Sequence, residues 1–258
     1  FFVMIGALIF LGCPIRMILR LGGGDLNALF GIAGFAGGIG FGTIFLKRGY
    51  SLQRTYALSK LESAMMPAIQ VGLLILVVTA PAFIFFSQKG PGAMHAPWLI
   101  SLAAGIVVGG LSQFSRLCTV GGFRDLFLFK KSILIFGYLA VLVGVFVVNI
   151  SFGNFHLGFE NQPIAHADGL WNFLGMALAG FCSVLLGGCP LRQLIMTGEG
   201  NSDAAVTVLG LAAGAAFAHN FGLAASGAGP TLNGQIAVGV GFVVALIIAI
   251  VNTKRANA

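Results

Sequence analysis

Two stretches of sequence decide the fold: Phe-Leu-Gly-Cys-Pro-Ile-Arg at residues 10–16, and Leu-Leu-Gly-Gly-Cys-Pro-Leu-Arg at residues 185–192. Each interrupts a long apolar run with a Gly-Cys-Pro break. Proline suits the first turn of a helix because the N–H that it lacks would have no helical partner there. We therefore expect a helix to begin at each proline, with Cys13 and Cys189 as the N-cap residues.

The composition outside these breaks is that of a membrane protein. Of the 258 residues, 58% are hydrophobic and 8% are charged, whereas soluble domains carry roughly 25% charged residues. So little charge cannot cover a water-facing surface, which excludes a soluble enzyme, a disordered chain and a nucleic-acid-binding protein. The net charge of +7 is typical of the positive-inside bias, and the 39 glycines suit close helix packing in a bilayer.

The apolar runs predict an all-α fold with about eight membrane-spanning helices in a single transmembrane domain over residues 1–258. A hydrocarbon core of about 30 Å needs about 20 apolar residues per helix. The expected spans are 1–19, 26–46, 64–88, 97–114, 132–150, 168–188, 204–224 and 234–252. Short or re-entrant helices are expected at 14–25, 115–131 and 189–203, which are too long for tight turns and too apolar for plain loops. Because the chain begins with Phe1, we expect an N-terminal segment to be missing.

Basic residues predict how the chain runs through the membrane, since cytoplasmic loops are enriched in Lys and Arg. The basic residues gather in two connections and the C-terminal tail, at Lys47, Arg48, Arg54, Lys60, Arg116, Arg124, Lys130, Lys131, Lys254 and Arg255. The 151–167 and 225–233 connections contain neither Lys nor Arg, and 89–96 contains only Lys89. This alternation predicts that both ends of the chain lie on the cytoplasmic side.

The two Cys-Pro stretches belong to a longer internal repeat. At a constant offset of 176 residues (189 − 13), Cys-Pro-Ile-Arg at 13–16 matches Cys-Pro-Leu-Arg at 189–192. Four glycine pairs keep the same offset, namely Gly22 and Gly198, Gly24 and Gly200, Gly34 and Gly210, and Gly38 and Gly214. The copies lie around 1–46 and 168–224, and five predicted spans separate their breaks, so they should point in opposite directions. Inverted repeats with interrupted helices are typical of transporters; the alternative is a duplication with no pathway between the copies.

Three of the four cysteines share a setting that suits anion binding. Cys13, Cys118 and Cys189 each lie near a proline or a glycine pair and within three residues of an arginine. A helix N-terminus offers free N–H groups and a positive dipole end, and a thiol there donates a weak hydrogen bond or ionises more readily. This setting favours a soft sulfur- or selenium-bearing anion. The alternative is that these cysteines only pack, as we expect of Cys182 in the middle of a span.

Charged residues near the breaks are the remaining candidates, because ionisable groups at membrane depth are costly and usually functional or paired. The primary candidates for offsetting an anion's charge are Arg16, Arg116 and Arg192. For Arg16 and Arg192 the alternative is that the side chains only reach out to the interface. The secondary candidates are Arg124, Asp125 and Glu199, which also suit local ion pairs.

Other polar residues are expected to have structural roles or none. Asp203 suits the N-cap of the seventh span, and His95, His156 and His166 fall in loops expected to be exposed. There is no Cys-x-x-Cys and no His at zinc-ligand spacing from a cysteine, so we expect neither a metal nor another cofactor. The sequence also lacks a nucleotide-binding loop and a nucleophile elbow, which argues against an enzyme and against direct ATP coupling.

The motifs at 10–25, 109–125 and 185–195 together resemble the YeeE/YedE family of bacterial inner-membrane proteins. The Gly-Cys-Pro-Ile-Arg and Gly-Gly-Cys-Pro-Leu-Arg forms are most similar to the YedE branch, which is associated with selenium metabolism. The family includes thiosulfate-uptake permeases in which cysteines in broken helices pass the anion inward by thiol hydrogen bonding. The resemblance covers nearly the whole chain and implies such roles for Cys13, Cys118 and Cys189. The Pro and Arg that follow two of these cysteines depart from the thiosulfate-type members, which leaves the substrate open.

We therefore expect a permease of the bacterial inner membrane, with a cytoplasmic C-terminus, that takes up a small sulfur or selenium anion along cysteine thiols. Cys13 would act near one side, Cys189 near the other, and Cys118 between them or at the exit. Two alternatives are a membrane sulfur or selenium transferase that uses a cysteine persulfide, and a non-catalytic membrane subunit. The expected partners are the anion and the lipid bilayer, and a cytoplasmic sulfur- or selenium-carrier protein is a candidate; the oligomeric state is open.

Overall fold

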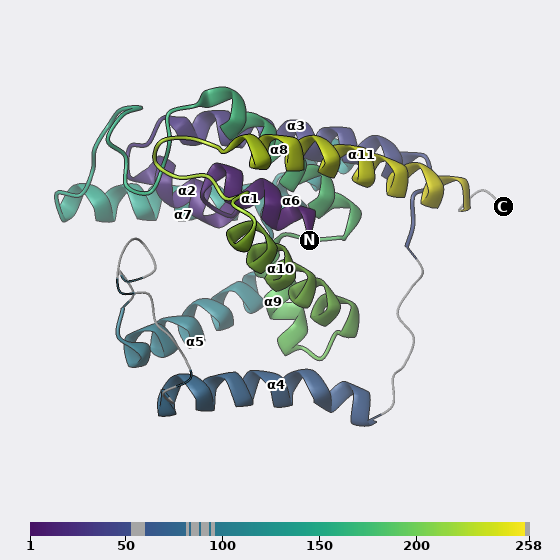
Figure 1. The fold of residues 1–258 in the computed structure, drawn as a ribbon, viewed down its shortest axis with the longest axis horizontal. Helices are drawn as coiled ribbons and strands as arrows, with labels where there is room; N and C mark the ends of the chain where they lie inside the picture. The colour runs from purple at the N-terminus through teal and green to yellow at the C-terminus, as the bar shows by residue number, and fades with distance from the viewer. Residues whose placement is uncertain (53–59, 81–82, 84–87, 89–92, 94–95, 256–258) are drawn as a thin grey trace.

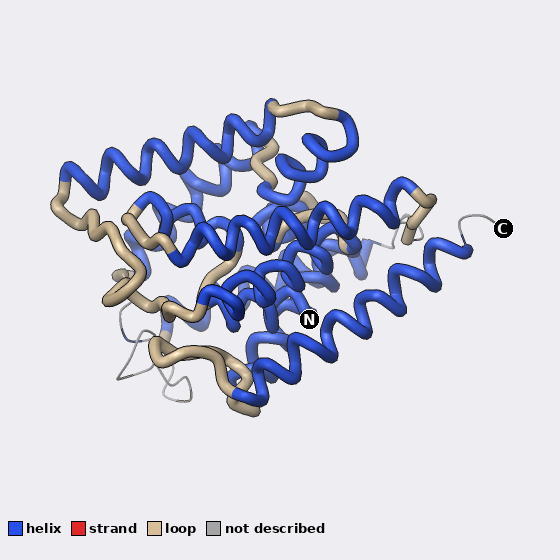
Figure 2. The backbone as a smooth tube through the Cα atoms, turned by 90° about the horizontal axis from the view of Figure 1, so that it is seen from above, coloured by secondary structure: helices blue, strands red, loops and turns tan. Residues whose placement is uncertain are grey.

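The structure is a computed structural model that describes residues 1–258 except 53–59, 81–82, 84–87, 89–92, 94–95 and 256–258, and except the side chains of 60–63 and 254–255. Every regular element in the described residues is a helix (Figures 1 and 2). The helices are α1 (Phe2–Phe10), α2 (Pro14–Gly22), α3 (Asn27–Lys47), α4 (Lys60–Thr79), α5 (Trp98–Ser115), α6 (Thr119–Phe129), α7 (Ile133–Ser151), α8 (Gly169–Leu185), α9 (Pro190–Gly198), α10 (Ser202–Asn220) and α11 (Leu232–Arg255).

Within the described residues, seven helical segments are long and apolar enough to cross a membrane. They are Phe2–Gly22, Asn27–Lys47, Trp98–Phe129, Ile133–Ser151, Gly169–Gly198, Ser202–Asn220 and Leu232–Thr253. These segments confirm the predicted all-α polytopic membrane fold, and they correspond to seven of the eight expected spans. The protein is therefore a multi-pass membrane protein.

The expected span at 64–88 is too long. Helix α4 ends at Thr79, its apolar part Ala64–Thr79 is shorter than a full span, and Ala80 has a positive φ of 39°. Pro81 follows in the sequence, and the residue before a proline is disfavoured in the α conformation. In Figure 1, α4 lies along the edge of the molecule, away from the α3 and α8 core. The basic residues Arg54 and Lys89 lie outside the described residues.

The short helices expected after each cysteine are present as α2, α6 and α9. The expected span at 1–19 is not one continuous helix, because α1 stops at Phe10 and α2 starts only at Pro14. The glycines paired by the repeat take the same conformation at the ends of α2 and α9. Gly24 has a φ of 100° and Gly200 a φ of 86°, a left-handed region that glycine enters without steric cost.

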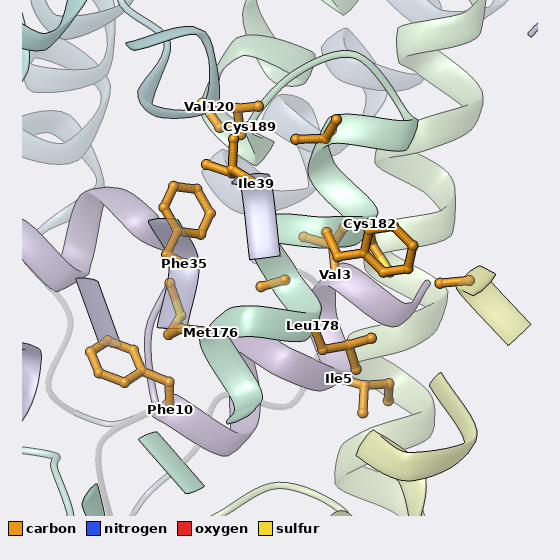
Figure 3. Packing of buried hydrophobic residues seen from close by; sticks show 14 of the residues in the cluster. Val3, Ile5, Phe10, Phe35, Ile39, Val120, Met176, Leu178, Cys182 and Cys189 are labelled. Atoms are coloured by element: carbon orange, nitrogen blue, oxygen red, sulfur yellow. The ribbon is translucent and has the colours of Figure 1, made fainter. Parts of the chain in front are cut away.

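Helices α3 and α8 form the largest helix–helix interface and the centre of the core, with α1 packed on α8 beside them. Their backbones approach closely because glycines lie at the contact. A Cβ on Gly34 would lie 2.0 Å from the carbonyl oxygen of Phe173, and one on Gly38 would lie 2.0 Å from that of Ala177. Small residues allow this approach in membranes. Figure 3 shows the buried side chains around this interface, with Cys189 at the Val120 end.

The outer helices expose apolar side chains instead of polar ones. Large exposed side chains on α5 and α7 include Leu99, Ile106, Phe136 and Val143. A water-soluble monomer rarely exposes contiguous apolar surface of this extent. These faces are therefore suited to contact lipid.

The loop that precedes α8 is anchored to the end of α1 by a buried histidine. His166 is 2% exposed, so the expectation that it lies in an exposed loop is wrong. Its Nε2 donates to the carbonyl of Ile9 at 2.8 Å, and its Nδ1 accepts the N–H of Asp168 at 3.3 Å. The N–H of Ala225 donates to the carbonyl of Leu8, so the connections before α8 and before α11 meet the same end of α1. This arrangement agrees with the prediction that both connections lie on one side of the membrane.

We predict that Gly38→Ala lowers the apparent melting temperature of the detergent-purified protein by about 3–10 °C. The new methyl group would force α3 and α8 apart, since the nearest atom on α8 is backbone and cannot rotate away. The matched control is Gly37→Ala on the same helix, where the nearest atom outside the helix is Phe173 Cζ at 3.9 Å. Equal melting temperatures for the two variants would contradict the proposed close contact.

We also predict that stability falls as the pH decreases below about 6.5. Burial lowers the pKa of His166 from its ordinary value of 6.5, so the folded protein keeps it neutral while the unfolded chain takes up a proton. The contribution of neutral His166 to the free energy of unfolding is complete above the pKa that His166 has in the unfolded chain. It is lost as the pH falls toward the lower pKa that His166 has in the folded protein. Melting temperatures from pH 8 to pH 5 should fall less steeply for His166→Gln than for wild type. The exposed His219→Gln is the control and should keep the wild-type slope.

Candidate functional site

The chain turns in the same way before each of the three candidate cysteines. Two residues before the cysteine, the backbone is left-handed: φ is 61° at Leu11, 51° at Arg116 and 90° at Gly187. The next N–H then donates to a carbonyl five residues back, in the bonds Gly12 to Ala7 (2.8 Å), Leu117 to Ser112 (3.1 Å) and Gly188 to Ser183 (3.0 Å). This is the Schellman pattern that ends a helix by satisfying its last carbonyl groups. The chain thus contains three units of helix, cysteine break, short helix and long helix: α1–α3, α5–α7 and α8–α10.

Each cysteine is the N-cap of the short helix that follows, as predicted for Cys13 and Cys189. The Cys118 sulfur accepts the N–H of Gly121 at 3.3 Å, and the Cys189 sulfur accepts the N–H of Arg192 at 3.5 Å. Cys13 makes no such side-chain bond and is half-buried, whereas Cys118 and Cys189 are buried. All four cysteines, including Cys182 within α8, are free thiols.

The breaks of the second and third units meet, which brings two of the thiols together. The side chains of Cys118 and Cys189 interact directly, and each sulfur also lies near a backbone N–H at the other's break. The hydroxyl of Thr119 lies beside the Cys189 thiol, is buried, and makes no hydrogen bond of ordinary geometry within the described residues. The N-termini of α6 and α9 therefore face one small polar region inside the core.

Tyr138 connects this region with the first unit. Its side chain lies within interaction range of both Cys13 and Cys189, and its hydroxyl donates to the carbonyl of Pro14 at 3.4 Å. The ring is 7% exposed and packs edge-on against Phe123. Cys13 and Cys189 thus lie near Tyr138, and Cys118 lies beside Cys189, although the three cysteines are distant in sequence. We refer to Cys13, Cys118, Cys189, Thr119 and Tyr138 as the thiol cluster.

The thiol cluster combines positive electrostatic character with weak, soft hydrogen-bond donors. The N-termini of α2, α6 and α9 all lie at the cluster and contribute partial positive charge and unpaired N–H groups. Thiols and hydroxyls can donate hydrogen bonds to a ligand there. Within the part of the chain that the structure describes, no group of three or more His, Cys, Asp or Glu could hold a metal ion. The arrangement suits a small anion that accepts hydrogen bonds.

The two arginines related by the repeat have different surroundings. Arg192 donates to Gln113 Oε1 at 3.0 Å and forms an ion pair with Glu199 at 3.4 Å, so its charge is partly balanced. Arg16 forms no ion pair within the described residues, and its buried Nε has no hydrogen-bond partner. The structure therefore leaves Arg16, and not Arg192, with unused capacity for an anion.

The remaining charged candidates lie outside the thiol cluster. Arg116 is exposed at the left-handed turn, and no ion pair or hydrogen bond holds its side chain among the described residues. Arg124 pairs locally with Asp125 at 2.9 Å, and it lines a pocket of about 530 Å³ that also includes Gly187 and Asp203. Asp203 is not the N-cap of α10, because Asn201 takes that place and accepts the N–H of Ala204.

Sequence reasoning missed Thr119 and Tyr138. Thr119 directly follows a cysteine N-cap, so its position in the short-helix pattern was a usable signal. Tyr138 lies in an ordinary apolar span, and nothing near it in the sequence indicates that it faces the cysteines. The pairing of Arg192 with Glu199 agrees with the expectation of an ion pair at the end of the short helix.

The fold and the thiol cluster define a class: multi-pass membrane proteins whose helices are interrupted at buried polar sites. Comparison with protein families gives a match to the family described as "Sulphur transport", over residues 114–255. The chain belongs to this family, the YeeE/YedE family, and is thereby placed among membrane sulfur-compound transporters. The matched range contains Cys118 and Cys189. Comparisons with curated proteins and with solved structures gave no match.

We predict that a small anionic thiol reagent labels Cys13 before the other cysteines in the detergent-purified protein. Cys13 is half-buried, whereas Cys118, Cys182 and Cys189 are each buried to at least nine-tenths. Mass spectrometry of peptides taken at successive times would give the order of labelling. Faster labelling of Cys182 than of Cys13 would contradict the described geometry.

Proposed function

We propose that the protein is a permease that takes up a small sulfur- or selenium-containing anion across the bacterial inner membrane. The observation that carries the proposal is the thiol cluster, in which three cysteines from three separate units gather at the N-termini of three short helices. A packing role alone would not require each cysteine to cap a helix at an equivalent break. Family membership supports transport of a sulfur compound.

The chemistry of the cluster favours thiosulfate, selenite or a related soft anion. Helix N-termini attract anions, and thiols donate hydrogen bonds to polarisable sulfur or selenium. Such weak donors can release the anion again, which transport requires. Cys13 would receive the anion, Cys118 and Cys189 would pass it on, and Arg16, Arg192 and Arg116 would offset its charge along the way.

The packing supports a pseudo-twofold relation between the repeat copies around 1–46 and 168–224, which we propose as the inverted repeat that frames the pathway. Helix α3 of the first unit packs on α8 of the third unit, and α10 of the third unit packs on α1 of the first. The glycines paired by the repeat lie at both contacts: Gly38 faces the Ala177 carbonyl, and Gly214 faces the Phe1 carbonyl. This exchange of equivalent helices is what a pseudo-twofold relation requires. Transporters built in this way bind their substrates at broken helices between the repeats.

The direction of transport follows from the predicted orientation. The connections without Lys or Arg, at 151–167 and 225–233, would face the outside, and the C-terminus would lie in the cytoplasm. The anion would then enter by Cys13 and leave toward the pocket lined by Arg124 and Asp203. A cytoplasmic sulfur- or selenium-carrier protein would be a suitable recipient there.

We predict that Cys118→Ala and Cys189→Ala each reduce uptake of labelled thiosulfate or selenite into proteoliposomes at least tenfold. The reason is that each removes a donor at the point where two breaks meet. Cys13→Ala should reduce uptake as well, whereas Cys182→Ala, buried within α8, should transport like wild type. Cys→Ser variants refine the test, because serine keeps a hydrogen-bond donor but its oxygen is less polarisable than the cysteine sulfur.

The outcomes separate the competing functions. Wild-type uptake in all three alanine variants would reject the thiol path and leave a non-catalytic subunit as the better interpretation. A stable persulfide on Cys118 or Cys189, found by mass spectrometry without uptake into vesicles, would instead indicate a sulfur or selenium transferase.

A further inference from the structure

A second polar pocket lies where the end of α2 meets α7 and the connection before α8. Its volume is about 460 Å³, and its lining includes Arg16, Arg20, Asp25, Asn149, His156 and Gln162. The connection before α8 belongs to the side that the charge pattern predicts to be extracytoplasmic. Of these residues, only Arg16 is a site candidate from the sequence.

Arg20 is the buried centre of this pocket, and one of its donors is unused. Its Nε donates to Asp25 Oδ2 at 2.6 Å, and its Nη1 donates to the carbonyl of Phe10, with the guanidinium stacked over the Phe10 ring. Its Nη2 is buried and has no hydrogen-bond partner, and the side chain is only 5% exposed. Burying a charged donor without an acceptor is costly.

Asp25 does not supply the missing acceptor, because it accepts from Arg20 only through Nε and its other hydrogen bonds come from Asn27. Oδ2 accepts from Arg20, and Oδ1 accepts from both the backbone N–H and the side-chain amide of Asn27, each at 2.9 Å. The pocket therefore has two guanidinium groups, those of Arg16 and Arg20, against the single carboxylate of Asp25. Its lining keeps one uncompensated positive charge.

Two side-chain amides of the pocket, those of Asn149 and Gln162, already donate to backbone carbonyls. The amide of Asn149 donates to the carbonyls of Gly22 and Val145, and that of Gln162 donates to the carbonyls of His156 and Gly158. Among the described residues, the buried donors of the pocket without a partner are Nη2 of Arg20 and Nε of Arg16, and both are charged. Two charged donors with no acceptor of their own require an anion with at least two acceptor oxygens.

We propose that this pocket is a separate binding site for a small oxyanion, which selects by charge and hydrogen bonding and does not use thiols. An oxyanion would accept from Arg16 and Arg20 together and balance the excess positive charge. Such a site does not distinguish sulfur from selenium, or thiosulfate from sulfate. Selection of soft anions over hard ones would depend on the thiol cluster.

Arg16 links this oxyanion pocket with the first thiol. Its side chain lies over Gly12, where a Cβ would be only 2.8 Å from Arg16 Cδ, directly beside Cys13. An anion held by Arg16 is therefore at the first break of the predicted pathway. The order of events, pocket first and thiols second, rests on the proposed function, but binding to the pocket does not.

The test measures equilibrium binding of labelled thiosulfate and labelled sulfate to the detergent-purified full chain. The triple variant Cys13→Ala, Cys118→Ala, Cys189→Ala should still bind both anions, and each should displace the other. Arg16→Gln should weaken binding about tenfold or more, as expected for loss of a charged hydrogen bond. The matched control is Arg48→Gln, which removes the same charge from an exposed position at the end of α3 and should bind like wild type.

A second measurement covers Arg20, whose replacement can disturb folding. Sulfate should raise the melting temperature of the wild-type protein and of the triple cysteine variant. It should not raise that of Arg16→Gln, or that of the double variant Arg20→Gln/Asp25→Asn, which removes the buried ion pair as a whole and is tested as purified folded protein. Loss of binding in the triple cysteine variant, or wild-type affinity in Arg16→Gln, would overturn the proposal. If the anions still bind but uptake does not depend on the cysteines, the thiol path of the proposed permease is rejected. The oxyanion pocket is then still supported.

Discussion

Inside a bilayer, a helix can stop only where its last carbonyls and the first N–H groups of the next helix find partners within the protein. This constraint organises the three breaks. Each preceding helix closes on itself through a left-handed residue and a bond from the residue before the cysteine, such as Gly12 to Ala7. At the start of α6 and of α9 a cysteine sulfur accepts one of the helix's N–H groups, whereas Cys13 makes no such bond at the start of α2. The demands of the backbone therefore account for both the position of the thiols and the free N–H groups around them.

The close α3–α8 contact is what allows three such breaks to share one small region. With Gly34 and Gly38 at the interface, the backbones of α3 and α8 lie so close that a Cβ at either position would overlap a backbone oxygen of α8. Phe35, Ile39 and Phe181 belong to the buried cluster at this interface. Figure 3 shows Ile39 next to Cys189. The second unit is held differently, because α5 and α7 bury few of their side chains, with α7 packed on α2 and α6, and α6 packed on α3.

The sequence was most informative where local chemistry dictates structure. Pro14 and Pro190 predicted two helix starts and their cysteine caps, and glycine at 24 and 200 marked two left-handed turns. Leu11 and Arg116 take the same left-handed conformation as Gly187 without being glycine, so the sequence showed the shared setting of the three cysteines but not the left-handed turn before each one. Long-range contacts were also out of reach. His166 acquires its partner only when the connection before α8 folds back over the end of α1, and Arg20 donates to the carbonyl of Phe10 only when α2 packs beside α1. No local pattern indicates either contact.

The meeting of α6 and α9 has an energetic consequence for the empty protein. Two helix N-termini that point at one region are like partial charges at short range, and each raises the electrostatic self-energy of the other. Covalent connection and packing hold them there, so the repulsion persists as long as nothing negative lies between them. An arriving anion relieves it, and the anion's departure restores it. Under the proposed function, an anion held between the thiols would lower this energy, so the closeness of the two N-termini would favour its binding.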